Sequence, residues 1–385
     1  MNDCTHIAIV TGYGSKGEGV ARLEGGRVAF IRGAARGDIC RIALVSERLR
    51  SCRAEISEII QPSEHRIAPD CPAYPICGGC DFRHITYEEE LRAKLWRVNS
   101  ALERIGCISL RADEIVYTGQ TDGYRNKAVL HVARLDGKSV IGFYRAGSHD
   151  ICPVERCLLL EDELNDALRG LWNAPSQTEK TVTLRSRSLG QKPQAPRQSG
   201  PGAATVAELD GLTFQISRTS FFQVNNGAAL LLYRKAREYA ALSSSEFLVD
   251  LYCGVGSLTL FAGRDAGYAL GVENNAAAVE DARRNALRNG LDNVGFVCAD
   301  VTDWDAGGVS PDCVTVDPPR RGLTAGALQR ILEMAPSRIV YLSCDPATLA
   351  RDICRFNGYE AKHICVVDMF PRTANVECCV LLFRK

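Results

Sequence analysis

The sequence predicts an α/β fold whose C-terminal part is a doubly wound, Rossmann-type sheet, preceded by a small β-barrel and a central α/β region. From about residue 210 onward, apolar runs typical of buried parallel strands alternate with helical segments. Two of these runs, 313–316 and 338–342, end directly before Asp317 and one residue before Cys344. Ligands bind outside the carboxyl ends of the strands in open α/β sheets. We therefore expect the functional site at that edge.

The barrel prediction comes from the N-terminal 60 residues. Short apolar runs at 6–10, 28–31 and 38–45 are separated by glycine turns, a pattern typical of a small β-barrel. Either RNA contact or a solvated barrel surface would explain the eight arginines of this segment, which are Arg22, Arg27, Arg32, Arg36, Arg41, Arg48, Arg50 and Arg53.

A helix is predicted after a segment at 61–85 that carries prolines and three cysteines. Thr86 and Glu89 form a capping-box pattern, apolar residues then recur at steps of four and three, and Gly106 can end the helix. We assign this helix a structural role without chemistry and expect it to pack on the C-terminal domain.

The rest of the central region mixes strands, such as 127–132, with a helix near 160–171. Residues 186–205 are rich in Ser, Gly, Pro and Gln, which indicates a loop or linker. The expected domains are a barrel at 1–61, a central region at 62–205 and a Rossmann-type domain at 206–385.

Composition restricts the class of protein. The 385 residues carry no net charge, so any nucleic-acid contact must come from local basic patches. No run of eighteen apolar residues appears and the N-terminus lacks signal-peptide features, so we expect no membrane span and a cytoplasmic protein. Seventeen cysteines in such a chain fit a reducing compartment, with most thiols buried and a few binding metal.

A nucleotide-type cofactor site is predicted where the run 247–249 leads into Asp250 and a Gly-x-Gly turn at Gly254 and Gly256. Glycines let the backbone approach a ligand closely. The next strand ends at Glu273, which can accept hydrogen bonds from ribose hydroxyls. The strand after it is followed by Asp300, which is placed to bind an adenine amine.

The third glycine of a dinucleotide fingerprint is missing, because Leu258-Thr259 follows Ser257. This favours S-adenosylmethionine over NAD, with a tight turn that binds no ligand as the remaining alternative. A carboxylate followed by Pro-Pro and then an aromatic residue is typical of amino methylation. Here Arg320 follows the two prolines, which weakens that alternative.

Five motifs together give the chain a specific resemblance. In order along the chain they are 220–225 (SFFQVN), 250–256 (DLYCGVG), 317–320 (DPPR), 343–346 (SCDP) and 370–377 (FPRTANVE). As a set they resemble the RNA uracil-5-methyltransferase family. The resemblance implies a nucleophile at Cys344 and a base at Glu377. It also implies cofactor contacts at Gln223, Tyr252, Gly254, Ser257, Glu273 and Asp300, with Asp317 holding uracil or cofactor.

The chemistry of uracil explains these residue types. Uracil C5 is a weak carbon nucleophile until a thiolate adds at C6, and a base must afterwards remove the C5 proton. A thiol combines high nucleophilicity with good leaving ability, as Cys344 would require. Asn375 departs from the family, which usually has His two residues before the glutamate, so the tuning of Glu377 differs here. We expect Cys378 and Cys379 to be inert core residues.

A second signal is the cluster Cys71-x5-Cys77-Gly-Gly-Cys80, which suits a metal site. The spacing does not decide between zinc and iron–sulfur, and a disulfide is a further alternative. The family resemblance implies a [4Fe–4S] cluster whose fourth ligand is Cys157, or failing that Cys152. Its role would be structural or RNA-positioning, because methyl transfer needs no electron.

The N-terminal barrel resembles the TRAM domain, an RNA-binding β-barrel. The resemblance implies 23S ribosomal RNA over transfer RNA as the partner of a monomeric enzyme, because the transfer-RNA branch of the family usually lacks both the barrel and the cysteine cluster. The target uridine must be single-stranded or flipped out to meet Cys344. Phe221 and Phe222 are either stacking residues or core, and 124–127 is a candidate phosphate contact. The rivals are another methyltransferase (an amino or cytosine-C5 enzyme) and an RNA-binding iron–sulfur protein without catalysis.

Overall fold

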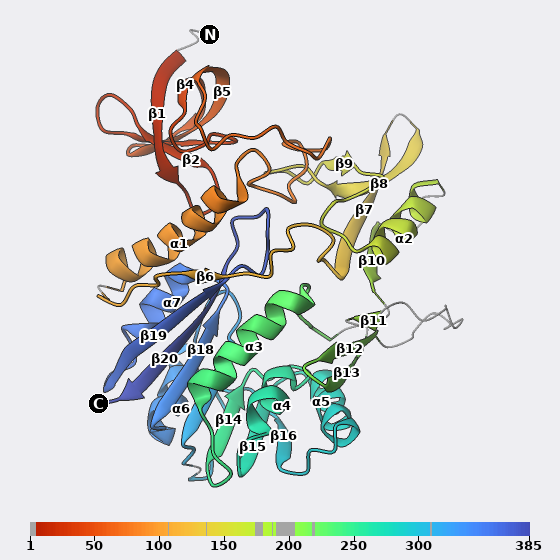
Figure 1. The fold of residues 1–385 in the computed structure, drawn as a ribbon, viewed down its shortest axis with the longest axis vertical. Helices are drawn as coiled ribbons and strands as arrows, with labels where there is room; N and C mark the ends of the chain where they lie inside the picture. The colour runs from red at the N-terminus through yellow and green to blue at the C-terminus, as the bar shows by residue number, and fades with distance from the viewer. Residues whose placement is uncertain are drawn as a thin grey trace.

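The computed structural model describes residues 5–106, 108–135, 137–173, 180–186, 188–189, 205–217, 220–308 and 310–385. A barrel lies at one end of the molecule, a large sheet flanked by helices lies at the other, and a smaller sheet lies beside them (Figure 1). The predicted linker at 186–205 falls almost entirely outside the described residues.

The N-terminal strands form a closed barrel in the order β1-β2-β3-β5-β4, as predicted. Alternate residues of each strand point inward, and the small core they form includes Val10, Ile31, Ile42 and Ala54. The bounds are β1 Thr5–Tyr13, β2 Gly19–Arg22, β3 Val28–Ile31, β4 Ile39–Glu47 and β5 Ser51–Gln61.

The predicted long helix is α1, Tyr87–Arg104. Thr86 caps it by accepting from the Glu89 amide, but the Glu89 carboxylate does not return to the cap. It accepts instead from the Arg36 guanidinium of the barrel at 2.7 and 2.8 Å. The capping-box pattern thus locates the helix start, while its acid joins the helix to the barrel.

The central region forms a four-stranded sheet in the order β10-β7-β8-β9. Helix α2, Asp162–Asn173, packs Leu164 and Leu168 against Leu130 and Ile141 of this sheet. A separate three-stranded sheet has the order β11-β12-β13. The bounds are β7 Lys127–Leu135, β8 Lys138–Tyr144, β9 Ile151–Pro153, β10 Thr181–Arg185, β11 Ser188–Leu189, β12 Thr205–Leu209 and β13 Leu212–Ile216.

The C-terminal domain is built on an eight-stranded sheet in the order β16-β15-β14-β17-β18-β20-β19-β6. Strands β14 to β18 are parallel, and β20 is antiparallel to both of its neighbours. The bounds are β6 Ile115–Val116, β14 Phe247–Leu251, β15 Tyr268–Glu273, β16 Val294–Cys298, β17 Cys313–Val316, β18 Arg338–Ser343, β19 Tyr359–Val367 and β20 Glu377–Arg384.

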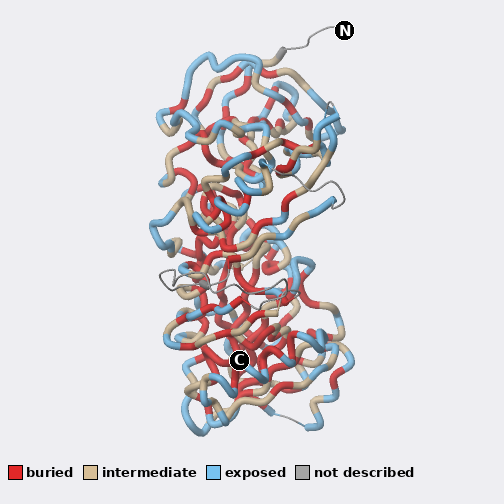
Figure 2. The backbone as a smooth tube through the Cα atoms, turned by 90° about the vertical axis from the view of Figure 1, so that its right-hand side faces the viewer, coloured by how far each residue is buried: buried red, intermediate tan, exposed pale blue. Residues whose placement is uncertain are grey.

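Helices cover both faces of this sheet, which confirms the predicted Rossmann-type fold. One face packs on α3, α4 and α5, and the other packs on α6, α7 and helix α1 of the predicted central region. Buried chain therefore concentrates in this half of the molecule (Figure 2). The bounds are α3 Asn226–Ala240, α4 Ser257–Gly263, α5 Ala276–Arg288, α6 Ala325–Met334 and α7 Pro346–Ile353.

Two segments of the predicted central region belong structurally to this sheet. Helix α1 places Val98 and Leu102 in its core, and strand β6 extends its edge by pairing with β19. Within the described parts of the chain, no helix is long and apolar enough to cross a membrane.

Candidate functional site

The turn after β14 has the backbone geometry that a close ligand approach requires. Tyr252, Gly254 and Gly256 all adopt positive φ angles, 63°, 55° and 79°. A Cβ on Gly254 would meet nothing within 4 Å, so the turn leaves open space beside its backbone. A Cβ on Gly256 would meet Phe296 at 2.8 Å, so that glycine is required for packing rather than for a ligand.

A small cavity of about 40 Å³ beside this turn collects five of the predicted cofactor residues. Ser257 lies at the start of α4, and its Oγ is 3.1 Å from the Oη of buried Tyr233. The five predicted residues that line the cavity are Gln223, Tyr252, Gly254, Ser257 and Asp317.

Glu273 and Asp300 lie outside this cavity, at the carboxyl ends of β15 and β16 on the same sheet edge. The Glu273 carboxylate accepts from the amides of Gly254 at 3.1 Å and Asn275 at 2.9 Å. The Thr302 amide donates to Asp300 at 2.8 Å and holds the pKa of that exposed carboxyl below its usual range. Hydrogen bonds from backbone amides therefore fix both side chains at this edge of the sheet.

Asp250 also lines the small cavity, although the sequence did not assign it a role. It is 1% exposed, and its two oxygens accept from Thr259 at 2.5 Å and Thr315 at 2.7 Å. Burial raises the pKa of Asp250 to about 7. Its place at the end of β14, directly before the glycine turn, was the available signal.

The sheet register brings Cys344 and Glu377 together. Strands β18 and β20 are antiparallel, and Ser343 pairs with Cys378. Cys344 follows Ser343 and Glu377 precedes Cys378, so these two residues lie opposite each other. Asp317 directly follows β17, the neighbour of β18 on its other side. The three predicted catalytic and substrate residues thus meet at the carboxyl edge of adjacent strands.

Burial raises the pKa of both acids of this cluster and of the thiol between them. Burial, with the nearby Asp317 carboxylate, raises the pKa of Glu377 well above its usual range. Burial raises the pKa of Asp317 to about 6. Burial and the Glu377 charge raise the pKa of the Cys344 thiol to about 11, and Arg320 opposes the rise for both Cys344 and Glu377.

Burial distinguishes the two neighbouring phenylalanines. Phe222 is 4% exposed and packs on Phe214, so it is core, whereas Phe221 is 67% exposed. Cys378 and Cys379 are buried in β20, as expected of core thiols.

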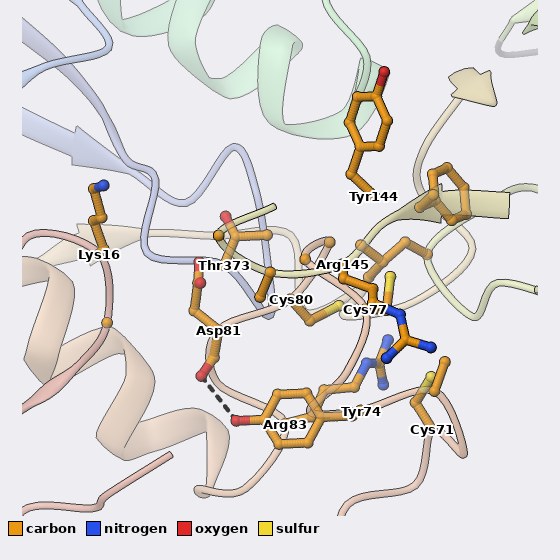
Figure 3. A pocket seen from close by; sticks show the side chains of 18 of the residues that line it. Lys16, Cys71, Tyr74, Cys77, Cys80, Asp81, Arg83, Tyr144, Arg145 and Thr373 are labelled. Atoms are coloured by element: carbon orange, nitrogen blue, oxygen red, sulfur yellow. Dashed lines mark hydrogen bonds between the residues drawn. The ribbon is translucent and has the colours of Figure 1, made fainter. Parts of the chain in front are cut away.

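A second cavity, of about 950 Å³, lies between the barrel, the central region and the catalytic domain. Cys71, Cys77, Cys80 and Cys157 all line it, and the first three are visible in Figure 3. Cys152 is not among the lining residues. Burial raises the pKa of the Cys77 and Cys80 thiols to about 11 and about 12.

In the parts of the chain that the structure covers, no three His, Cys, Asp or Glu side chains form a group that could hold a single metal ion. None of the fifteen described cysteines forms a disulfide, so the disulfide alternative for this segment lacks support. Asn165 accepts from the Cys157 amide at 2.9 Å and donates to its carbonyl at 3.0 Å, which fixes that backbone toward the cavity.

Cationic side chains surround the same cavity, which extends to the neighbourhood of the predicted catalytic residues. Arg320 and Asn375, from the neighbourhood of Cys344 and Glu377, line its far end. The acidic lining residues are Glu18, Glu55 and Asp81, against nine basic ones, which suits a polyanion. The basic residues are Lys16, Arg32, Arg53, Arg83, Arg125, Lys127, Arg145, Arg156 and Arg320.

Family models match two overlapping parts of the catalytic domain. One, described as tRNA (Uracil-5-)-methyltransferase, matches residues 300–385, and one described as methyltransferase domain matches residues 248–334. In fold, the chain is similar to the Pyrococcus abyssi tRNA (uracil-54, C5)-methyltransferase crystallised with S-adenosyl-L-homocysteine. The TM-score is 0.74 at 24% identity, and the match covers 98% of this chain and 100% of the other.

Relatives match along nearly the whole chain. An uncharacterized RNA methyltransferase of Clostridium tetani is 30% identical, with 98% of this chain and 96% of the relative covered. One of Bacillus cereus is 32% identical, covering 96% and 94%, and one of Thermosynechococcus vestitus is 33% identical, covering 95% of each. The uracil-5-methyltransferase model matches the residues that include Cys344 and Glu377. The chain therefore belongs to the RNA (uracil-5-)-methyltransferase family, whose members are S-adenosylmethionine-dependent enzymes.

Proposed function

We propose that this enzyme methylates C5 of a specific uridine through a covalent adduct between Cys344 and uracil C6, with Glu377 as the base. The observation that carries the proposal is the register of β18 and β20, which sets Cys344 and Glu377 opposite each other beside Asp317. A nucleophile and a base on opposed strand ends can act on adjacent atoms of one ring.

The proposed reaction consists of an addition, a methyl transfer and an elimination. The Cys344 thiolate adds to C6, and the electrons of the C5–C6 double bond move into an enolate. C5 then forms a bond to the methyl group of S-adenosylmethionine as the methyl–sulfur bond breaks, and the electron pair of that bond stays on the sulfur of the departing S-adenosylhomocysteine. Glu377 removes the C5 proton, the C5–C6 double bond re-forms, and the C6–S bond breaks to release the Cys344 thiolate.

The methyl donor would occupy the sheet edge beside β14, β15 and β16. Glu273 and Asp300 would accept hydrogen bonds from its ribose and adenine, and Gln223, Tyr252, Gly254 and Ser257 would hold its amino-acid end. The supporting observations are the open space beside Gly254 and the two fixed carboxylates. Asp317, which lines the same small cavity, would hold the uracil or the donor at the junction with Cys344.

The substrate we propose is 23S ribosomal RNA, bound single-stranded in the basic cavity. The choice rests on the family resemblance, in which the cysteine segment favours the ribosomal branch, and that segment forms one wall of the cavity. The barrel does not separate the two RNA classes, because the fold match to a protein described as a tRNA methyltransferase extends over 98% of this chain. Transfer RNA is therefore the second candidate substrate.

The test is nucleoside mass spectrometry on unmodified ribosomal and transfer RNA, each incubated with anaerobically purified protein and S-adenosylmethionine. We expect new 5-methyluridine in 23S RNA alone, and fragment mapping then locates it. Product in transfer RNA alone would overturn the substrate while leaving the mechanism. A different methylated base in either RNA would contradict the proposed chemistry.

We further propose that Cys71, Cys77, Cys80 and Cys157 bind a [4Fe–4S] cluster. Each cysteine of such a cluster binds a different iron, so the four thiols surround a volume instead of converging on one ion. Four cysteines that line one cavity provide the number of thiolate ligands that such a cluster requires. None of the fifteen described cysteines forms a disulfide, which supports a reducing, cytoplasmic location, and a site built from residues of one chain supports a monomer.

The ligand assignment predicts different effects for two neighbouring serine variants. Cys157→Ser is expected to lower the iron and sulfide bound per chain several-fold, because Cys157 lines the cavity. Cys152→Ser is expected to retain both, because Cys152 does not. Metal and sulfide analysis after anaerobic purification distinguishes them. Equal loss in the two variants, or zinc in place of iron, would refute the assignment.

A further inference from the structure

The segment that joins β19 to β20, residues 368–376, leads directly into Glu377 and is mostly buried. It has no strand or helix of its own, so its backbone groups must find partners elsewhere. A few of those partners are local, such as the Phe370 carbonyl for the Thr373 amide, but others come from parts of the chain more than 140 residues away in sequence. Tyr124 Oη, for example, donates to the Pro371 carbonyl at 3.0 Å, and Asn225 donates to that of Met369 at 3.1 Å.

Helix α1 holds the start of the segment through a buried ion cluster. Lys94 Nζ donates to Asp368 Oδ1 and to Glu90 Oε1, each at 2.6 Å, and to the Phe370 carbonyl at 3.1 Å. All three charged side chains are at most 1% exposed. Buried charges are tolerated only when paired, so this cluster has one favourable arrangement. The segment start is thereby fixed to α1.

Arg372, in the middle of the segment, has a backbone conformation that needs external support. Its φ of 68° is unfavourable for a residue with a Cβ. Its amide donates to Glu90 Oε1 at 2.7 Å. Its carbonyl accepts from the amides of Asp81 at 2.9 Å and Phe82 at 3.2 Å. Three hydrogen bonds, from α1 and from the segment 71–82 that carries the clustered cysteines (the cysteine loop), therefore hold the unfavourable conformation.

Asp81 adds a second bond close to the base. Its Oδ2 accepts from the Ala374 amide at 2.8 Å, three residues before Glu377. Asp81 directly follows Cys80 in the cysteine loop, and Figure 3 shows it beside Thr373 of the segment. The cysteine loop and the segment that carries the base thus share a pair of reciprocal hydrogen bonds.

We infer that Asp81 and Glu90 are positioning residues for the base of the reaction, acting through the 368–376 segment. The inference rests on the proposed role of Glu377. Because Glu377 acts only after the methyl group has moved to C5, a displaced segment slows C5 proton removal and leaves thiol addition intact. The specific consequence is a methylated covalent RNA adduct that persists.

The test is Asp81→Ala, followed with methyl-labelled S-adenosylmethionine and the substrate RNA. We expect kcat to fall about tenfold without a rise in KM for RNA, and the fraction of protein held in denaturation-resistant, labelled adduct to increase. Asp81→Asn removes the charge but keeps an oxygen that accepts from Ala374, so it should restore wild-type partition between adduct and product. Comparison of the two variants separates the effect of losing the hydrogen bond to Ala374 from the effect of losing a negative charge in the basic cavity.

Asp70→Ala is the matched control. Asp70 directly precedes Cys71, and it pairs with Arg83 instead of the catalytic segment, so the partition should not change. Lower methylation in Asp81→Ala without adduct accumulation, or equal accumulation in Asp70→Ala, would overturn the inference. Absence of labelled product from the wild-type protein would instead be a failure of the proposed function. Binding of S-adenosylmethionine by each variant verifies its fold.

Discussion

Replacing Cys344 by alanine is expected to lower kcat/KM for 5-methyluridine formation by about four to six orders of magnitude. Removal of a covalent nucleophile has effects of this size because the remaining site cannot activate the substrate by another route. Here the thiol is needed to turn C5 into a nucleophile, and the described residues opposite it are the carboxyls of Glu377 and Asp317. Single-turnover assays with mass-spectrometric detection measure the loss.

Cys354→Ala is the matched control for this variant. Cys354 lies at the C-terminal end of α7, the helix that begins shortly after Cys344, and its side chain is directed toward the Gly106 carbonyl. We expect its activity within about twofold of wild type, as is usual for surface substitutions. Retention of a tenth or more of the activity by Cys344→Ala would contradict the covalent mechanism and favour another methyltransferase chemistry.

The pH dependence provides an independent readout of the same thiol. The reactive form of Cys344 is the thiolate, and burial raises its pKa to about 11. Well below that value the ionised fraction rises about tenfold for each pH unit. Glu377 also acts in its ionised form, and its pKa is raised too, so both groups favour higher pH. We expect kcat/KM to increase from pH 7 to pH 9 without a plateau.

The local parts of this site could be predicted because strand ends carry their own signal. Apolar runs that stop at Asp317 and just before Cys344 indicate parallel strands, and parallel strands align their carboxyl ends. The opposition of Cys344 and Glu377 also needs an antiparallel β20 at a particular register, which the sequence pattern does not specify. The pairing of Cys344 with Glu377 was therefore expected from the family resemblance and not from the sequence pattern.

The function of α1 could not be predicted, because its partners are remote in sequence. Lys94 and Asp368 are separated by 274 residues, and Asp81 and Ala374 by 293. Helical periodicity reports which face is buried but not which buried acid meets which distant base. Lys94 lies on the apolar side of the helix pattern, and this was the one available sign of a buried ion cluster.

Glu377→Gln is expected to arrest the reaction after methyl transfer, with kcat lowered about 10²- to 10⁴-fold. Glutamine has nearly the same shape but cannot accept the C5 proton, so the C6–S bond to Cys344 cannot break. A labelled, denaturation-resistant RNA–protein adduct should therefore accumulate to nearly one per active site. Asp317→Asn keeps the base, and it should slow methylation without this accumulation.

The adduct experiment discriminates between roles that the geometry alone leaves equivalent. Glu377 and Asp317 both lie beside Cys344, and burial raises the pKa of each. Only the group that removes the C5 proton can cause accumulation of a methylated adduct when its carboxyl is replaced. If Asp317→Asn traps the adduct and Glu377→Gln does not, the base is Asp317. The segment held by Asp81 and Glu90 would then position a residue with another role.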